Sequence, residues 1–180
     1  LLLLPLFLII SVFIKIESTG GIFYTQERLG KNLKPFKFYK FRTMYKDSDK
    51  LPEGFSALEG DKRITKVGKI LRDWSIDELP QLLNVIQGKM SIVGPRPCLE
   101  KEFRKFLGKK EIKKRFEVNP GITGLAQVSG RNNLTWEEKI PLDLEYINTL
   151  NSKGIYLDIS IILRTIRVVL QKEGLYEEDK

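Results

Sequence analysis

Residues 72–97 read RDWSIDELPQLLNVIQGKMSIVGPRP, and the order of charges, apolar residues and turns in them sets the expected fold. Two adjacent acids, Asp77 and Glu78, stand at the start of a predicted helix, and a tight Gly-Pro-Arg-Pro turn closes the stretch. Arg72 and Arg96 flank the acids on either side. Adjacent carboxylates can hold a cation, and guanidinium groups bind phosphate oxygens in a planar fork. The stretch therefore suits a site for a metal ion and a phosphate.

The same residues also fit an ordinary helix start. Ser75 is a good N-cap residue, Glu78 follows at capping-box spacing, and Asp77 in the first turn complements the helix dipole. The apolar residues then recur at helical spacing, at Leu79, Leu82, Leu83 and Ile86. By spacing alone, structural capping is the more common explanation of this pattern.

Composition limits the chemistry. The chain has 180 residues, enough for one domain, and its net charge of +8 with a pI of about 9.5 favours an anionic partner such as nucleic acid, lipid headgroups or a phosphorylated substrate. There is no histidine, which excludes histidine-based nucleophile systems and histidine metal sites. The single cysteine, Cys98, permits no internal disulfide, fits a reducing compartment, and is expected to be a small buried side chain.

The chain begins with an apolar run. Residues 1–14 are almost entirely apolar until Lys15, and the absence of an initial Met suggests a start inside a longer apolar segment. The visible run is too short to span a bilayer. A helix broken at Pro5 could enter one leaflet and return; a buried core helix and the end of a transmembrane helix are the alternatives. We expect residues 1–19 to be membrane-inserted and re-entrant, and residues 20–180 to form a separate cytosolic domain.

Two strands are predicted near the N-terminus. Residues 22–25 form the first, residues 26–32 form a loop, and residues 36–44 alternate aromatic and basic side chains in a strand with one basic face. That face carries Lys40 and Arg42. It could stack with nucleic acid, bind phosphate, or simply be a half-buried strand with solvated lysines.

The remaining elements are mostly helical. Residues 99–118 form a charged amphipathic region broken at Gly108, which could lie on an anionic membrane surface or cover the core. Before this region we predict a helix at 62–73, and after it a turn-rich loop at 119–124, an extended piece at 125–128 and a tight turn that carries Arg131. Two helices are predicted at the end of the chain. The first is capped by Thr135 and Glu138 and runs to about Leu150, and the second spans residues 156–172. The expected class is α+β, mostly helical with a small sheet.

Five motifs occur in the order and spacing of one family, and together they cover almost the whole chain. They are residues 23–30 (FYTQERLG), 39–44 (YKFRTM), 77–81 (DELPQ), 91–97 (SIVGPRP) and 120–128 (PGITGLAQV). In these motifs the chain resembles the bacterial sugar transferases, the monotopic polyprenyl-phosphate phosphoglycosyl transferases. Five motifs in order are specific enough to outweigh the capping interpretation.

The resemblance implies transfer of a phosphosugar from a UDP-sugar to polyprenyl (undecaprenyl) phosphate, with release of UMP, as the first membrane step of glycoconjugate or exopolysaccharide assembly. It implies that Asp77 is the nucleophile, that a covalent phosphosugar-aspartate forms, and that Glu78, with Asp77, holds Mg²⁺. It places the enzyme at the cytoplasmic face of the bacterial inner membrane, in contact with membrane lipid and with no nucleic-acid partner; oligomers are possible. The family turns back in the membrane at a Ser-Pro pair, whereas this chain has Leu4 before Pro5.

Physical chemistry agrees with these roles. A carboxylate can attack phosphorus without first losing a proton, so a chain without histidine can form the covalent intermediate. The nucleophile and the diphosphate are both anionic, which calls for a cation to screen them. We expect Arg72 and Arg96 to clamp substrate phosphate, with Lys40, Arg42 and Arg131 as further candidates.

Two other hypotheses stay open at this point. One is a membrane-tethered basic module that binds anionic lipid or nucleic acid. The other keeps the phosphoryl transfer but lets the lipid phosphate attack the donor directly, with no covalent enzyme. The sugar of the donor and the glycan pathway are not legible in the sequence.

Overall fold

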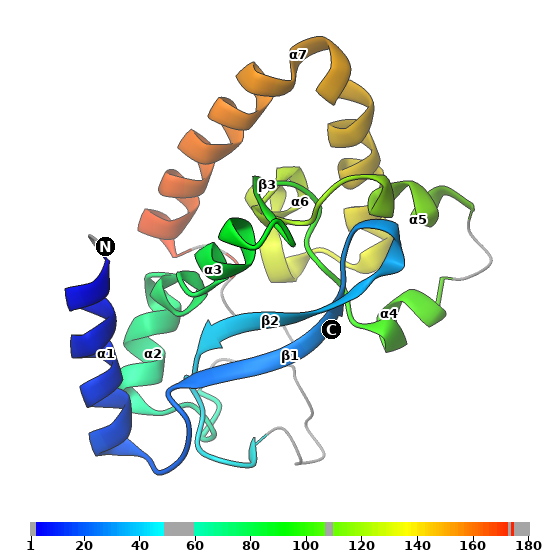
Figure 1. Cartoon of the computed structure of the whole chain (residues 1–180). Helices are drawn as coiled ribbons and strands as arrows, with labels where there is room; N and C mark the ends of the chain where they lie inside the picture. Colours follow the sequence, from blue (N-terminus) through cyan, green and yellow to red (C-terminus); the bar gives the residue numbers. More distant parts are fainter. Residues whose placement is uncertain (1–2, 49–59, 107–109, 173, 175–180) are drawn as a thin grey trace.

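The computed structural model describes residues 3–48, 60–106, 110–172 and 174 (Figure 1). Helices predominate, and the strands form two small sheets, so the α+β prediction is confirmed. One sheet pairs β1 (Phe23–Leu29) with β2 (Pro35–Phe41) in antiparallel register. The other pairs β3 (Ser91–Val93) with β4 (Gly121–Thr123) in parallel.

The first hairpin is longer than predicted. The expected loop at 26–32 is wrong in its first part, because β1 continues to Leu29 and the chain turns only at Lys31–Leu33 (η1). In β2, Phe36, Phe38 and Phe41 are buried. Lys37 is exposed while Lys40 reaches inward, so the two lysines do not form one basic face.

The N-terminal helix α1 (Leu4–Glu17) carries Pro5 in its first turn and does not break there. Proline is tolerated in a first turn, where its missing N–H has no helical acceptor. The predicted break at Pro5 is therefore not found in the described chain, and a re-entrant path stays a prediction. None of the described helices has the length and apolar composition that crossing a bilayer requires.

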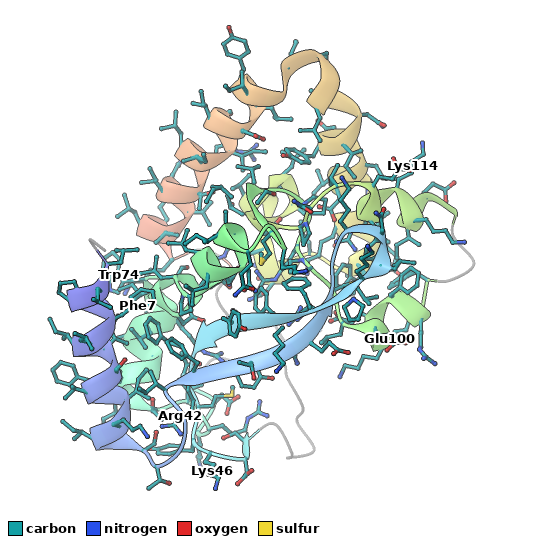
Figure 2. All side chains as sticks on the ribbon, viewed as in Figure 1. Phe7, Arg42, Lys46, Trp74, Glu100 and Lys114 are labelled. Atoms are coloured by element: carbon teal, nitrogen blue, oxygen red, sulfur yellow. The ribbon has the colours of Figure 1, made fainter. Side chains whose placement is uncertain are left out.

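One side of α1 packs against the rest of the protein. Ile10 and Ile14 are buried against Phe41 of β2 and Leu71 of α2 (Lys66–Asp73), and the ring of Phe7 lies 4.9 Å from that of Phe41 (Figure 2). The other side of α1 is open to solvent and apolar, at Leu4, Leu6, Leu8, Ile9, Val12, Phe13 and Ile16. The helix is thus only half covered by protein.

The two predicted C-terminal helices are present as the two arms of α7 (Trp136–Gln171), which meet at a kink and form the inverted V at the top of Figure 1. It starts with the predicted capping box of Thr135 and Glu138, and Lys153 leaves the helical conformation at the bend. The Tyr146 hydroxyl donates to Asp158 Oδ1 at 2.9 Å, joining the two arms across the bend. The second arm returns toward α2.

The middle of the chain also differs from the sequence-based expectation in places. The extended piece predicted at 125–128 is wrong: these residues belong to α6 (Leu125–Ser129), and part of the predicted loop before them is strand β4. The amphipathic region consists of short helices, α4 (Glu100–Arg104), α5 (Lys110–Lys114) and η4 (Arg115–Glu117), and the predicted break at Gly108 lies outside the described residues. Its packing favours the core interpretation, since Phe103, Ile112 and Phe116 are buried in one cluster.

Candidate active site

The acid pair lies on a tight turn between two helices. Ser75 adopts a left-handed conformation with φ of 53°, a 3₁₀ turn follows at η3 (Ile76–Glu78), and α3 (Gln81–Ile86) begins after Pro80. The predicted capping box of Ser75 and Glu78 is wrong, because the Ser75 side chain caps no helix. Its hydroxyl instead accepts a hydrogen bond from Arg131 Nη2 at 2.9 Å.

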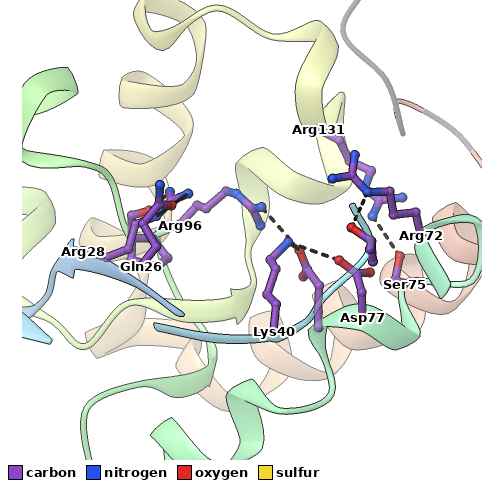
Figure 3. Close-up of polar contacts among 11 residues, drawn as sticks. Gln26, Arg28, Lys40, Arg72, Ser75, Asp77, Arg96 and Arg131 are labelled. Carbon is purple, nitrogen blue, oxygen red and sulfur yellow. Dashed lines mark hydrogen bonds and ion pairs between the residues drawn. The ribbon is translucent and has the colours of Figure 1, made fainter. Parts of the chain in front are cut away.

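Lys40 bridges the two acids. Its Nζ lies 2.6 Å from Glu78 Oε1 and 3.5 Å from Asp77 Oδ2 (Figure 3). Arg96 Nη2 approaches the same Glu78 oxygen at 3.3 Å. The structure therefore brings together four of the predicted site residues, two acids and two cations, from β2, η3 and the Gly-Pro-Arg-Pro segment.

The two acids differ in their electrostatics. Asp77 is almost fully buried; burial raises its pKa, and the neighbouring charge of Glu78 adds to this, while Lys40 opposes it. Burial also disfavours the charged form of Glu78, but the positive charges of Lys40 and Arg96 outweigh it and lower the Glu78 pKa. Glu78 is thus firmly ionised, while Asp77 is a desolvated carboxylate whose charge is less well compensated.

Two further arginines lie on the other side of the acids. Arg72 extends from α2 with its Nε donating to Thr43 Oγ1 at 2.8 Å, and its charge acts on Asp77. Arg131, in η5 (Arg131–Asn133), reaches Ser75 and is itself partly desolvated, so burial lowers its pKa. Figure 3 shows both near Ser75 and Asp77, opposite Arg96. All of these side chains line one open cleft of about 1030 Å³.

Arg42 also borders the cleft, but its guanidinium is engaged elsewhere. It donates to the carbonyl oxygens of Ser18 and Thr19, at the end of α1, and it is 9% exposed. The structure thus uses Arg42 to hold the carbonyls of the two residues that follow α1. It does not join the arginines that surround the acids.

Two arginines beside the site, Arg28 and Arg115, were not among the residues predicted from the sequence. Arg28 of β1 donates through Nη1 to the Pro97 carbonyl at 2.8 Å and through Nε and Nη2 to Gln26 Oε1. Arg115 of η4 donates to the Arg96 carbonyl at 2.9 Å. Gln26 and Arg28 are two residues apart, and a strand would place them on one face; predicting a loop there hid that signal.

A divalent cation fits the acid pair in chemistry. No three side chains of metal-ligating type gather anywhere in the described ranges, so a cage made entirely of protein ligands is absent from them. Mg²⁺ commonly needs only one or two carboxylates, with phosphate oxygens and water completing the shell. The ammonium group of Lys40 lies within ion-pair distance of both carboxylates, so the pair attracts positive charge.

Comparison with known proteins gives a consistent result. The sequence model of the family described as bacterial sugar transferase matches residues 1–172. The uncharacterized sugar transferase EpsL of Bacillus subtilis (strain 168) is 44% identical over 172 residues, covering 96% of this chain and 80% of EpsL.

Two further relatives are longer than this chain. The galactosyl transferase CpsE of Streptococcus agalactiae serotype III (strain NEM316) is 43% identical over 180 residues, covering 92% of this chain and 39% of CpsE. The UDP-glucose:undecaprenyl-phosphate glucose-1-phosphate transferase of Caulobacter vibrioides (strain ATCC 19089 / CIP 103742 / CB 15) is 40% identical over 178 residues, covering 96% of this chain and 65% of the relative. The chain therefore spans about two fifths of CpsE and about two thirds of the Caulobacter protein. Since the family model covers nearly the whole sequence and these relatives align along it, the chain belongs to the bacterial sugar transferase family.

Proposed function

We propose that this chain transfers a sugar phosphate from a UDP-sugar to undecaprenyl phosphate and releases UMP. The observation that carries the proposal is the buried pair of acids, Asp77 and Glu78, enclosed by cations in one open cleft. The Caulobacter relative is named for transfer of glucose 1-phosphate from UDP-glucose to undecaprenyl phosphate. Family membership and that name support the same class of reaction here.

Asp77 is the proposed nucleophile. Its carboxylate oxygen attacks the phosphorus that bears the sugar, the bond from that phosphorus to the bridging oxygen breaks, and UMP leaves with the electron pair. The phosphate oxygen of the lipid then attacks the same phosphorus and displaces Asp77, which yields a polyprenyl diphosphate sugar. Desolvation of Asp77 favours this role, because a carboxylate stripped of water is a stronger nucleophile.

The surrounding cations match the charge that phosphoryl transfer generates. Catalysis of this kind consists mainly of positioning and neutralising charge on phosphoryl oxygens. Arg96 and Lys40 lie on one side of the acids and Arg72 and Arg131 on the other, so a diphosphate placed over Asp77 meets a guanidinium group at each end.

Mg²⁺ is the cofactor that this site would hold, with Glu78 and Asp77 as ligands. When bound, it would neutralise diphosphate oxygens and screen them from the attacking carboxylate. Lys40 then serves as the cation that keeps the two acids together when the cleft holds no metal.

A lipid acceptor requires contact with a membrane, and two surfaces suit it. The uncovered side of α1 and the second arm of α7 both expose large apolar residues; on α7 these are Ile155, Tyr156, Ile159, Ile162, Leu163, Ile166 and Leu170. A chain with net charge of +8 is attracted to anionic headgroups. These features support a location at the cytoplasmic face of the bacterial inner membrane.

The test is UMP release by the purified protein in detergent with Mg²⁺, undecaprenyl phosphate and a panel of UDP-sugars, beside Asp77→Asn. UMP released from one donor and lost in the variant supports the proposal and names the sugar. Mass spectrometry after incubation with the donor alone should show a phosphosugar adduct on Asp77. UMP released only with lipid, without an adduct, means direct attack; no UMP from folded protein favours a module that binds anionic lipid.

A further inference from the structure

The segment that carries Arg96 is held almost entirely through its carbonyl groups. Pro95 and Pro97 have no N–H to donate, so the backbone of this segment offers few other hydrogen-bonding groups. Four consecutive carbonyl oxygens accept hydrogen bonds from three different parts of the chain, two of the donors being neighbours in β1. The donors are Gly121 N to Pro95 at 2.9 Å, Arg115 Nη2 to Arg96 at 2.9 Å, Arg28 Nη1 to Pro97 at 2.8 Å and Leu29 N to Cys98 at 2.9 Å.

Two of these four donors are arginine side chains, and Arg115 is the more firmly fixed of them. It is 4% exposed, its guanidinium lies 4.9 Å from the ring centre of Trp136, and its Nε donates to Asp143 Oδ2 at 2.7 Å. Asp143 belongs to α7 and is 1% exposed. The Arg115 guanidinium therefore connects Asp143 of α7 to the backbone of Arg96.

A buried ion pair is by itself weak evidence for a stabilising role. Removing two charges from water costs free energy that their attraction often fails to recover, and apolar replacements can be as stable. Here the Arg115 guanidinium makes a further hydrogen bond, from Nη2 to the carbonyl of Arg96, and the side chain of Arg96 in turn reaches Glu78.

We propose that Arg115, oriented by Asp143, is a positioning residue for Arg96. It fixes the backbone from which the Arg96 guanidinium reaches the acid pair, and it touches neither donor nor acceptor. The kinetic part of this inference rests on the proposed sugar-phosphate transfer, whereas the part that concerns the backbone segment does not.

Two replacements separate positioning from stability. Arg115→Lys keeps a positive charge beside Asp143 but loses the planar fork that reaches both partners. The double replacement Arg115→Met with Asp143→Leu removes both charges together and fills the space with apolar groups, so it should fold even if the lysine variant is weakened. Ile161→Val and Ile161→Ala, in the separate cluster around α7 and α6, serve as controls for lost stability alone.

The first readout is labelling of the only cysteine in the sequence. Cys98 is 1% exposed and is the last residue of the held segment, so a thiol reagent reaches it only when the protein opens there. At equal loss of global stability, we expect both Arg115 variants to label at least about tenfold faster than the Ile161 controls. Equal labelling rates would overturn the inference.

The second readout is a double-mutant cycle on kcat/KM for UMP release. We expect Arg115→Lys to lower kcat/KM by about tenfold to hundredfold in the wild-type background, as for other residues that orient functional groups. In an Arg96→Ala background, the same replacement should change it less than about twofold. Equal effects in both backgrounds, or full activity in the double replacement, would overturn the inference. Absence of UMP from the wild type would refute the proposed function, and the labelling result would still decide whether Arg115 holds the segment.

Discussion

Lys40 gives the most direct test of how the acid pair works. Its ammonium group is 2.6 Å from Glu78 and 3.5 Å from Asp77, and replacement by methionine keeps the apolar stem while removing the charge. Among the described residues, Asp77 would then keep no ion-pair partner within 4 Å, and Glu78 would keep Arg96. The replacement thus removes the ion pairs of Lys40 with both acids and leaves two adjacent carboxylates with less compensating charge.

The size of the effect follows from these distances. Two unit charges 4 Å apart interact by about 4 kcal/mol at an effective dielectric constant of about 20. The Lys40 side chain is 21% exposed, so water replaces part of this interaction, and we expect a loss of about 1–2 kcal/mol of unfolding free energy. A similar loss of stabilisation in the transition state lowers kcat/KM by about fivefold to thirtyfold.

The pH dependence has a definite sign. Burial already raises the pKa of Asp77, and Lys40 opposes that rise. Without Lys40, a larger fraction of Asp77 is protonated at neutral pH, so UMP release by Lys40→Met should recover partly as the pH is raised. Lys37→Met is the matched control, because Lys37 is an exposed lysine on the same strand. Wild-type turnover in Lys40→Met across the pH range would refute this account of the site.

Three further predictions concern the structure around the site. A β-carbon added at Gly121 would lie 2.1 Å from a backbone nitrogen, so Gly121→Ala should lower the free energy of unfolding, measured by urea denaturation, by about 3 kcal/mol or more. Gly88 has open space around it but a φ of 69°, so Gly88→Ala should lower the same free energy by about 1 kcal/mol. Arg42→Met should lower stability by about 2 kcal/mol, because two carbonyls at the end of α1 lose a charged donor, and should leave the KM for the UDP-sugar within about twofold; a large KM increase would restore Arg42 as a phosphate ligand. Hydrogen bonds from Arg63 lower the pKa of Asp61. The ionised Asp61 therefore stabilises the fold at pH values above its ordinary pKa of 3.8, and this contribution is lost as the pH falls. In Asp61→Asn, the free energy of unfolding should consequently fall less steeply at acid pH.

The same four-residue pattern succeeded at one place in this sequence and failed at another. Thr135 and Glu138 form the predicted capping box, because Thr135 is extended and its hydroxyl accepts from the N–H of Glu138, although α7 contains Pro141. Ser75 and Glu78 have the same spacing, but Ser75 is left-handed, and Pro80 cannot donate to the carbonyl of Ile76. The chain makes a 3₁₀ turn instead, in which Leu79 N donates to that carbonyl at 3.1 Å.

Sequence pattern was therefore sufficient to predict features that lie within one helix or strand. It was insufficient for side chains whose partners are brought close only by the tertiary structure. The residue types of the site, the hairpin and the capped start of α7 could be predicted from periodicity and motif order. Arg42 could not be assigned, because its partners are carbonyl groups just after α1, 23 and 24 residues earlier in the chain. Arg28 and Arg115 donate hydrogen bonds to carbonyl groups 69 and 19 residues away in the sequence. The periodicity of apolar residues along the chain gives no sign of such contacts.

The arginines near the cleft differ in whether an acidic side chain neutralises their charge, and this difference sets their roles. Arg115 has its own buried carboxylate, Asp143, and therefore contributes little net charge to the cleft while fixing the backbone of Arg96. Arg28 has no ion pair with a described acid; burial and the nearby charge of Arg96 lower its pKa to about 10. It thus adds positive charge as well as a hydrogen bond. Loss of Arg28 should consequently weaken anion binding even when Arg96 is absent, whereas loss of Arg115 should matter only while Arg96 is present.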